Sequence, residues 1–479
     1  MSELIARYFD RLAGREDAVL TDLSGGLRRS VTGRDLPDLT DRVAGWLAAQ
    51  GVQRGDRVVA VFDNRLEAAL LLLAALRHGI TLCLQPANAE AQALADLAAG
   101  LGARAIISAA TPCPEGATPL TLEAAAASPA HPAPDLAPQT PFTLTFTSGS
   151  TGAPKGILHA AESFLGCAAA FNRQTGIGAG DRFLNVMPMY YMAGIFNGLL
   201  APLAAGASVV IDAAFGTPTA LRFWPRVAEE GITALWLSPT MLSLVMRLDR
   251  GDKVLPAGFR RLFVGTGAMA ARDAQAFLDS YGMAPLQSYG LSELLYISVD
   301  DPGQPHFGSV GRPLDGVRVH LDADGRLGFS TPHAFLGYLV EGALIPPEPV
   351  FATSDLGALE DGILSILGRS DDIILRGGVN VNPIEIERAL APLFKGRGFC
   401  VTGLPDATLG QKVVLVFEGA TARPEDDEIW ARARQIVAQG PGRAQLDARA
   451  QIAALPLGPT GKIRRAALRE TLAAAEGAA

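Results

Sequence analysis

The stretch "TFTSGSTGAPKG" (residues 145–156) is the most informative part of this chain. An apolar run from Phe142 to Phe146 leads into it, and a second apolar run begins at Ile157. Between the two runs stand small and hydroxylated residues, followed by Lys155. Glycines let backbone N–H groups approach a ligand closely, hydroxyls donate further hydrogen bonds, and a lysine adds positive charge. The composition therefore indicates a loop that binds the phosphates of a nucleotide.

Other glycine-rich motifs do not fit. A Walker A loop requires Gly-Lys followed by Ser or Thr, whereas Lys155 stands between Pro154 and Gly156. The GxSxG turn of serine hydrolases fails as well, because no serine here has glycines at the required spacing. A plain surface turn would not need two threonines, two serines, three glycines and a lysine together. A second glycine-rich stretch, "TGIGAGDR" (residues 175–182), follows no strand and is interpreted as a turn.

Composition excludes several classes of protein. The 479 residues are 49% hydrophobic and 19% charged, which is typical of a globular protein of two or three domains or subdomains. A formal net charge of −8 argues against a nucleic-acid binder. The longest apolar run, Ala68 to Leu76, is too short to span a membrane, and the N-terminus has no signal-peptide pattern, so we expect a cytoplasmic protein. The cysteines are far apart and are expected to be buried thiols rather than disulfides or zinc ligands: Cys83, Cys113, Cys167 and Cys400.

Short β-rich runs alternate with helical patterns along most of the chain. Helices are expected at 39–51 and 66–79, and strands at 56–62, 80–84 and 103–108. Further strands are expected within 181–188, 206–211, 232–237, 261–265 and 285–290. This alternation predicts an α/β fold with parallel sheets. Residues 109–141 are expected to be an irregular connection, a β-rich subdomain is expected from about Val317, and a compact α+β tail from about Gly368.

The phosphate-loop candidate resembles, position by position, that of the adenylate-forming superfamily. This superfamily includes acyl-CoA synthetases, peptide-synthetase adenylation domains and firefly-type luciferases. The resemblance continues in the family's order through "QSYGLSE" (287–293), "FATSDLG" (351–357), "GRSDDIILRGGVNVNPIEIE" (368–387) and "LPLGPTGKIRR" (455–465). It implies a large N-terminal AMP-binding domain of α/β subdomains plus the β-rich subdomain, residues 1–369, and a small mobile α+β C-terminal domain, residues 370–479.

The resemblance also assigns roles to residues that bind ATP or AMP. Tyr289 would stack on adenine, Glu293 would hold Mg²⁺, and Asp355 and Arg369 would bind the ribose. Asp371 would be the hinge of the C-terminal domain. The catalytic residues would be Lys462, Glu293 and Thr147. The remaining nucleotide contacts would come from Thr147, Ser148, Gly149, Ser150, Thr151, Gly152, Lys155, Gly267, Ala268, Gln287, Ser288, Gly290 and Ser292. Ser354 departs from the family pattern, which usually has glycine beside this aspartate.

The acyl pocket is expected between two stretches, "MPMYYMAG" and "VGTGAM" (264–269). By the same resemblance, "VGTGAM" would be the loop that lines both the adenine and the acyl pocket, and "LSPTML" (237–242) would be the helix start at the wall of that pocket. Its lining would be Tyr190, Tyr191, Met192, Asn197, Gly265, Thr266 and Leu291, with Met189 and Gly267 nearby. No aspartate stands in the first stretch to pair with an α-amino group, which disfavours an amino-acid substrate. The lining favours an apolar or aromatic acid with one polar handle; the alternative is that half of these residues pack the core. Gly377 and Gly378 would form a path for the pantetheine arm of CoA.

These assignments predict an AMP-forming carboxylate–CoA ligase. It would use Mg²⁺, ATP and CoA with a small carboxylic acid, and would bind neither nucleic acid nor membrane. We expect a monomer or a homodimer. Three alternatives stay open: an adenylating enzyme that loads the phosphopantetheine of a carrier protein, a luciferase-like oxygenase, and a silent paralogue that acts as a binding module.

Overall fold

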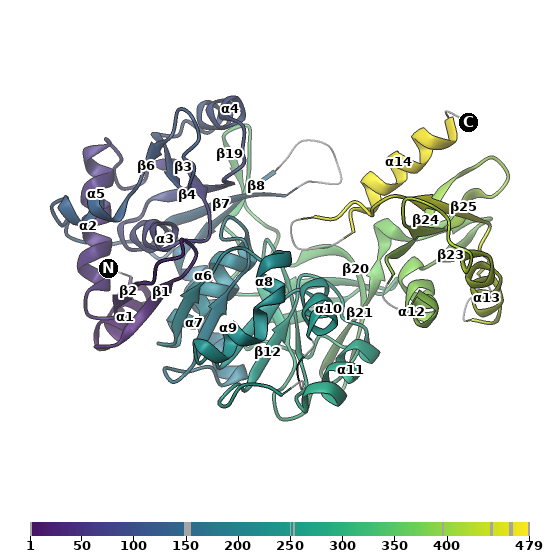
Figure 1. The fold of residues 1–479 in the computed structure, drawn as a ribbon. Coiled ribbons are helices and arrows are strands. Elements are labelled where there is room, and N and C mark those ends of the chain that lie inside the picture. The colour runs from purple at the N-terminus through teal and green to yellow at the C-terminus, as the bar shows by residue number, and fades with distance from the viewer. Residues whose placement is uncertain are drawn as a thin grey trace. The chain divides into compact units, whose positions relative to one another are not determined.

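The computed structural model describes residues 2–147, 155–249, 251, 254–394, 397–440, 444–458 and 463–477. The chain divides into two compact units. Figure 1 shows the elements of both, coloured by residue number from purple at the N-terminus to yellow at the C-terminus. The first unit contains Met1–Arg318 and Ser330–Phe351, and the second contains Val319–Phe329 and Ala352–Ala479. This division groups residues 352–369 with the second unit, and the functional boundary after Arg369 stays a prediction.

A nine-stranded sheet forms one layer of the first unit. Its central six strands are parallel, and antiparallel strands close both edges. Parallel strands in this sheet are buried on both faces, which explains their continuous apolar sequences. In sheet order the strands are β15 (Arg312–Pro313), β14 (Leu295–Val299), β13 (Leu286–Leu291), β12 (Arg261–Val264), β11 (Ala234–Leu237), β9 (Arg182–Asn185), β10 (Ser208–Ile211), β1 (Ala18–Asp22) and β2 (Arg29–Thr32).

An eight-stranded sheet forms the second layer of the first unit. Five of its strands run parallel, and an antiparallel extension continues beyond them. That extension contains the hairpin that flanks the phosphate-loop candidate. In sheet order the strands are β19 (Ala343–Ile345), β18 (Gly337–Val340), β8 (Lys155–Ala160), β7 (Pro141–Thr147), β4 (Thr81–Pro86), β3 (Arg57–Phe62), β5 (Ala105–Ala109) and β6 (Thr118–Pro119).

Helix α3 (Leu66–His78) explains the longest apolar run of the chain. Almost every residue in it is buried, and it contacts β1 of one sheet and β4 and β5 of the other. A helix that is apolar on all sides is stable only when it is surrounded. Gly79 ends it in the left-handed conformation, with φ of 70°. One hydrophobic core accordingly joins α3 to both sheets.

Further helices cover the two sheets, and the first unit also contains a π-helix, η1. Helix α6 contacts α1, η1 and strands of both sheets. The helices are α1 (Glu3–Ala13), α2 (Leu36–Ala49), α4 (Ala91–Leu101), α5 (Leu122–Ala127), α6 (Ala161–Thr175), η1 (Ala193–Leu200), α7 (Ala201–Ala204), α8 (Thr217–Leu221), α9 (Phe223–Glu229), α10 (Pro239–Leu248) and α11 (Ala271–Tyr281).

The second unit contains two further sheets. A four-stranded sheet has the order β16 (Arg318–Leu321), β17 (Arg326–Ser330), β20 (Phe351–Glu360) and β21 (Ile363–Arg369). The other sheet has β23 (Val379–Val381), β22 (Ile374–Arg376), β25 (Gly410–Glu418) and β24 (Phe399–Asp406), with β26 (Ala448–Ile452) paired to β25. The helical elements of the second unit are η2 (Ser370–Asp372), α12 (Pro383–Phe394), α13 (Asp426–Gln439) and α14 (Arg465–Gly477). Separate apolar clusters form on α12 with α13 and on α14.

The expected α/β fold is confirmed, with two local corrections, and the stretch 175–182 contains the expected turn between the end of α6 and the start of β9. Residues 109–141 are not entirely irregular, because they include β6 and α5, whose start is capped by Thr121 accepting from the Ala124 N–H at 3.1 Å. Three of the four cysteines are buried as expected, but Cys113 is exposed. None of the described helices is long and apolar enough to cross a membrane.

Candidate active site

The phosphate-loop candidate connects two strands whose register is fixed. Strands β7 and β8 pair antiparallel, and Thr147 lies opposite Lys155 at the open end of the ladder. The strands therefore hold both ends of the loop together. The predicted contacts Ser148, Gly149, Ser150, Thr151 and Gly152 lie outside the described residues.

Glu293 lies in the turn between β13 and β14, and its carboxylate is held from a distant part of the sequence. The Tyr338 hydroxyl donates to Glu293 Oε1 at 2.8 Å. The backbone N–H of Phe335 donates to the carbonyl of Glu293 at 2.9 Å. Lys155 Nζ lies 5.5 Å from the centre of the Tyr338 ring, within the range of a cation–π contact. Burial and the neighbouring Glu293 carboxylate raise the pKa of Tyr338, so its hydroxyl stays a donor.

This carboxylate suits magnesium in one specific way. Within the described ranges, no three His, Cys, Asp or Glu side chains are grouped so that they could hold a metal alone. Mg²⁺ in nucleotide enzymes is typically bound by one or two carboxylates together with substrate phosphates and water. Glu293, half-buried and held by Tyr338, matches that mode. A bound Mg²⁺ would neutralise phosphate charge as pyrophosphate leaves.

Gln287 and Ser288 support the predicted adenine loop from behind. Gln287 Oε1 accepts from the Met269 N–H at 3.0 Å, and its Nε2 donates to the Gly267 carbonyl at 3.1 Å. The Ser288 hydroxyl donates to the Val264 carbonyl at 3.2 Å. Both side chains are buried and engaged in these contacts, so the structure gives them a role in shaping the segment 264–269.

That segment contains an unusual backbone conformation. Thr266 has φ of 66°, in the left-handed region that a β-branched residue rarely adopts. Gly265 before it is buried, and a Cβ there would lie 2.5 Å from the ring of Trp236. Thr266 and Ala268 are exposed, and Gly267 is half-buried. Strained residues concentrate at ligand-binding sites, and this one falls inside the predicted adenine and acyl region.

Asp300 is buried directly behind Gln287. Its carboxylate accepts from the backbone N–H of Gln287 at 3.0 Å and from that of His306 at 3.3 Å. Burial raises the pKa of Asp300 to about 6, although these hydrogen bonds act in the opposite direction. Asp300 thus fixes the backbone of the adenine motif at the cost of holding a carboxylate away from water.

The rest of the "QSYGLSE" motif lies at the end of β13. Tyr289, Leu291 and Ser292 are half-buried, which leaves part of each accessible. Gly290 is required sterically, because a Cβ there would lie 2.2 Å from the carbonyl oxygen of Leu295.

The predicted acyl-pocket residues divide into accessible and buried members. The rings of Tyr190 and Tyr191 meet edge to face with centroids 5.9 Å apart, and Tyr191 is 40% exposed. Met192 and Asn197 are half-buried, and Asn197 belongs to the π-helix η1. π-Helical turns are frequent at functional sites. Met189 is fully buried and belongs to the hydrophobic core.

In the second unit the predicted ribose and hinge residues form a charged cluster around Arg369. Asp355 is buried and lies opposite Arg369 in the β20–β21 ladder, with 3.8 Å between Asp355 Oδ1 and Arg369 Nε. Arg369 also donates to the Ser354 hydroxyl and, at 3.0 Å, to Asp371 Oδ2. Burial would raise the pKa of Asp371, but hydrogen bonds with Ser354 and Arg369 outweigh it and lower that pKa. Ser354, the departure noted in the sequence, therefore joins the ribose and hinge candidates.

Gly377 and Gly378 form the two-residue turn between β22 and β23. Their φ values are 55° and 79°, as a type I′ hairpin turn requires. This requirement explains the glycine pair without a ligand, and its role as a CoA path stays a prediction. Lys462 lies outside the described residues; the flanking residues Leu457 and Ile463 pair in an isolated bridge.

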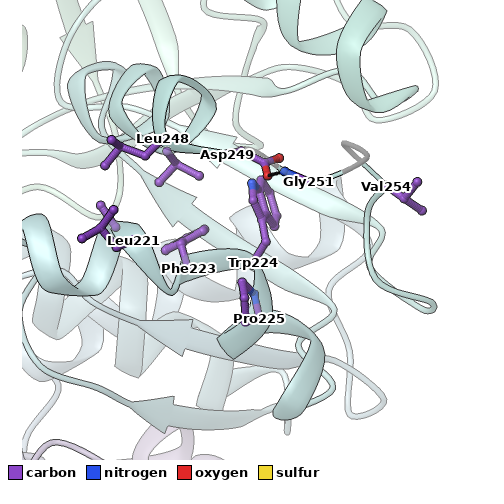
Figure 2. A pocket seen from close by; sticks show the side chains of 10 residues that line it. Leu221, Phe223, Trp224, Pro225, Leu248, Asp249, Gly251 and Val254 are labelled. Atoms are coloured by element: carbon purple, nitrogen blue, oxygen red, sulfur yellow. Dashed lines mark hydrogen bonds between the residues drawn. The ribbon is translucent and has the colours of Figure 1, made fainter.

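A pocket of about 640 Å³ lies elsewhere in the first unit. Figure 2 shows Leu221 and Leu248 on one side of Trp224 and Val254 on the other. The pocket lies at the C-terminal end of α10, whereas the motif "LSPTML" (237–242) runs from the last residue of β11 through the N-cap Ser238 into the first turn of that helix. None of the residues that line this pocket is one of the predicted adenylate-site residues.

Comparison with known proteins identifies the family. A family model described as AMP-binding enzyme matches residues 9–339. The chain belongs to the AMP-binding enzymes. A relative of this AMP-binding enzyme, the sulfoacetate–CoA ligase of Cupriavidus necator, is 30% identical over 469 residues, covering 87% of this chain and 88% of that protein. The fatty acid–[acyl-carrier-protein] ligase MmaC of Mycobacterium marinum is 28% identical over 480 residues, covering 88% of both chains.

Solved structures of other proteins share the fold of this AMP-binding enzyme. The anthranilate CoA ligase AuaEII, in complex with anthranoyl-AMP, has a TM-score of 0.86 at 20% identity, and 98% of each chain is covered. ATP-bound MatB from Rhodopseudomonas palustris has a TM-score of 0.82 at 24% identity, also over 98% of each chain. The family, the fold and the enzyme class expected from the sequence, an AMP-forming acyl-CoA synthetase, are confirmed.

Sequence reasoning missed three contributors to the site. Tyr338 stands in an ordinary-looking strand, "FLGYLV", and only the pairing of β18 with β8 brings it to Lys155. Asp300 follows the adenine motif as one of two adjacent aspartates and carries no motif of its own. Ser354 was noticed as a departure, but its contacts depend on the β20–β21 register.

Proposed function

We propose that this AMP-binding enzyme activates a small monocarboxylic acid with Mg·ATP and transfers the acyl group to the thiol of CoA. The observation that carries the proposal is the grouping of Glu293, Tyr338 and Lys155 beside the two strands that hold the phosphate loop. It supplies one carboxylate for a metal and one cation beside the loop. The CoA-ligase relatives support the same reaction.

The first half-reaction joins two anions. A carboxylate oxygen attacks the α-phosphate of ATP, an acyl–O–P bond forms, and the bond to pyrophosphate breaks. Positive charge must be present where negative charge accumulates. We assign the departing pyrophosphate to the loop and Lys155, the metal to Glu293, the ribose to Asp355 and Arg369, and the bridging cation to Lys462.

The second half-reaction breaks the acyl–oxygen bond. The CoA sulfur attacks the acyl carbon, a thioester forms, and AMP leaves with the oxygen that came from the acid. We assign the thiol path to the second unit around Gly377 and Gly378, and rotation about Asp371 to the exchange between the two half-reactions. Holding the thiol at the acyl carbon would supply much of the needed rate.

The side chains in the acyl-pocket segments favour an acid with a single negative charge. Residues 186–200, 234–245, 264–270 and 287–295 contain no lysine and no arginine. A second carboxylate or sulfonate buried there would lack a cationic partner, which is costly. The exposed Tyr191 ring and the half-buried Tyr190 ring instead offer an aromatic wall, and Asn197 offers one polar handle. We therefore propose an aromatic or apolar monocarboxylate, in contrast to the acids named for the sulfoacetate–CoA and malonate–CoA ligases.

Loading of a carrier protein is the second candidate. The relative MmaC, named as a ligase for an acyl-carrier protein, favours it, whereas the CoA-ligase relatives favour CoA. Mg²⁺ as the metal, a cytoplasmic location and a monomeric or homodimeric state remain parts of the proposal that derive from the sequence.

The test is pyrophosphate release from Mg·ATP with a panel of acids, each with CoA, with a phosphopantetheinylated carrier protein, and with neither. Benzoate, phenylacetate and hexanoate represent the proposed class, and malonate and sulfoacetate represent dianions. The proposal predicts continuous release and a thioester with CoA for at least one monocarboxylate and none for the dianions. Release that continues only with the carrier protein would favour the second candidate. No release with any acid would contradict both.

A further inference from the structure

The segment 335–338 contacts the adenine and metal motif (287–293), although Tyr338 lies 45 residues after Glu293 in the sequence. Strand β18 pairs with β8 so that Tyr338 lies opposite Ile157 and Leu339 lies opposite Gly156. Side chains two residues apart on a strand share a face, so Lys155 is a diagonal neighbour of Tyr338. A Cβ at Gly156 would lie 3.4 Å from the Cβ of Leu339 across this pair, and a Cβ at Gly337 would lie 2.3 Å from the carbonyl oxygen of Ile345 on the other neighbouring strand, β19.

Tyr338 uses different parts of its side chain for its two contacts. Its hydroxyl donates to Glu293 Oε1 at 2.8 Å, while its ring faces Lys155 Nζ at 5.5 Å. The ring is itself held by Phe335, whose centroid lies 4.8 Å away in an edge-to-face arrangement. The Phe335 N–H fixes the backbone of the Glu293 turn as well. One short segment therefore constrains both the carboxylate and the turn that presents it.

The hydrogen bond from the Tyr338 hydroxyl orients the Glu293 carboxylate. A hydroxyl that donates to one carboxylate oxygen fixes the plane of the carboxylate and leaves the other oxygen to bind a metal. Partners of this kind orient metal ligands and typically change metal affinity by about 10–100-fold when removed. The same ring limits where the Lys155 ammonium can lie, which affects the phosphates rather than the metal.

We propose that Tyr338 is a positioning residue that orients the Glu293 carboxylate toward the metal of Mg·ATP and, through its ring, places Lys155 beside the phosphate loop. The proposal rests on the proposed function, because it assumes that Glu293 binds the metal. It adds a separation of roles within one side chain. The hydroxyl acts on the metal, and the aromatic face acts on the lysine.

Two substitutions separate these roles. Tyr338→Phe removes the hydroxyl and keeps the ring, whereas Tyr338→Leu removes both. Tyr281→Phe is the matched control, because the Tyr281 hydroxyl also donates to a carboxylate, Asp249 Oδ2, at 2.7 Å, beside the pocket at the far end of α10. Thermal unfolding of all three variants reports whether any effect is merely loss of fold.

The main readout needs no turnover. Binding of Mn²⁺ to the full-length protein with α,β-methylene-ATP is followed by electron paramagnetic resonance, and binding of the same analogue without metal is followed by calorimetry. We expect Tyr338→Phe to weaken Mn²⁺ binding about tenfold and to leave metal-free analogue binding unchanged. Tyr338→Leu should weaken both, and Tyr281→Phe neither. In steady state, Tyr338→Phe should raise the Mg²⁺ concentration needed for half-maximal rate more than it lowers kcat at saturating Mg²⁺.

Three results would overturn the proposal. Mn²⁺ binding by Tyr338→Phe equal to that of the wild type would remove the role of the hydroxyl. An equal loss in Tyr281→Phe would show a general effect of losing a phenol. Wild-type protein that binds the analogue without any metal dependence would contradict both the role of Tyr338 and the metal in the proposed function. If the wild type is active and metal-dependent but Tyr338→Phe binds metal equally well, only the role of Tyr338 is contradicted.

Discussion

Glu293 in the first unit meets a neutral hydroxyl, whereas Asp355 and Asp371 in the second unit both face one guanidinium, that of Arg369. The first arrangement leaves most of the carboxylate's charge available to a ligand. The second offsets one of its two negative charges with the guanidinium of Arg369. A ligand that binds Asp355 or Arg369 must therefore compete with an existing ion pair, whereas within the described part of the chain no cation forms an ion pair with Glu293. The Glu293 carboxylate of the first unit is therefore open to a cation, whereas the ribose and hinge candidates of the second unit must give up an ion pair to bind a ligand.

The largest effect on activity should come from Lys462 of the second unit. Lys462→Ala should lower acyl-adenylate formation by on the order of 10²–10³-fold, because it removes the cation assigned to the bridging position. Carboxylate-dependent exchange between pyrophosphate and ATP measures this step. Lys412→Ala, another lysine of the second unit, is the control and should keep the exchange rate. Near-normal exchange by Lys462→Ala would show that Lys462 is not the bridging cation.

Removal of Asp355 should come next. Asp355→Ala should raise the KM for ATP by about 10–100-fold, since hydrogen bonds to a charged group contribute about 1.5–3 kcal/mol. The comparison of ATP with 2′-deoxy-ATP and 3′-deoxy-ATP assigns the effect to the ribose. The wild type should discriminate against at least one analogue, and the variant should not. Glu360→Ala, at the exposed end of the same strand, should keep the discrimination. A variant that still discriminates would remove Asp355 from the ribose site.

Asp300 gives the first unit a distinctive dependence of stability on pH. Its pKa is about 6 in the fold, above its ordinary value of 3.8. Between these values the folded protein holds a proton that the unfolded chain releases, so stability from this group is present below pH 3.8 and is lost as pH rises to 6. In Asp300→Asn, the slope of unfolding free energy against pH should therefore be more positive than in the wild type by up to about 1.4 kcal/mol per pH unit between pH 4 and 6.

Urea unfolding at a series of pH values measures this slope. Between pH 7 and 8, above both values, the wild type and Asp300→Asn should have equal slopes, which serves as the internal control. Equal slopes between pH 4 and 6 would show that Asp300 is not held protonated by the fold.

The smallest effect should come from Ser354. Ser354→Ala removes a hydroxyl that joins Arg369 to Asp371, but the direct contact between those two remains. Because partly exposed ion pairs contribute about 0–1 kcal/mol, we expect the KM for ATP to rise by no more than about fivefold. Steady-state kinetics with ATP as the varied substrate checks this, and a change as large as that of Asp355→Ala would show that Ser354 contacts the nucleotide itself.

Features that depend on local sequence patterns could be predicted from the sequence. The apolar run of α3 and the short strands follow from hydrophobic period and glycine stops, and the phosphate loop follows from a contiguous motif. The sequence could not predict side-chain contacts that depend on the register between strands far apart in the chain. Tyr338 meets Lys155 and Glu293 only because β18 pairs with β8, and a one-residue shift would turn its side chain to the other face. The hairpin turn at Gly377 and Gly378 shows the reverse case, in which a motif residue has a structural requirement that the pattern alone did not reveal.

The measurement that tests the central claim most directly follows one oxygen atom. A monocarboxylate that supports pyrophosphate release is labelled with oxygen-18 in its carboxylate and is converted with ATP and CoA, and the nucleotide products are analysed by mass spectrometry. Attack on the α-phosphate followed by thiolysis predicts AMP that carries one labelled oxygen, together with unlabelled pyrophosphate and an acyl-CoA thioester. Unlabelled AMP, or ADP with the label in phosphate, would contradict an acyl-adenylate and with it the account of the site.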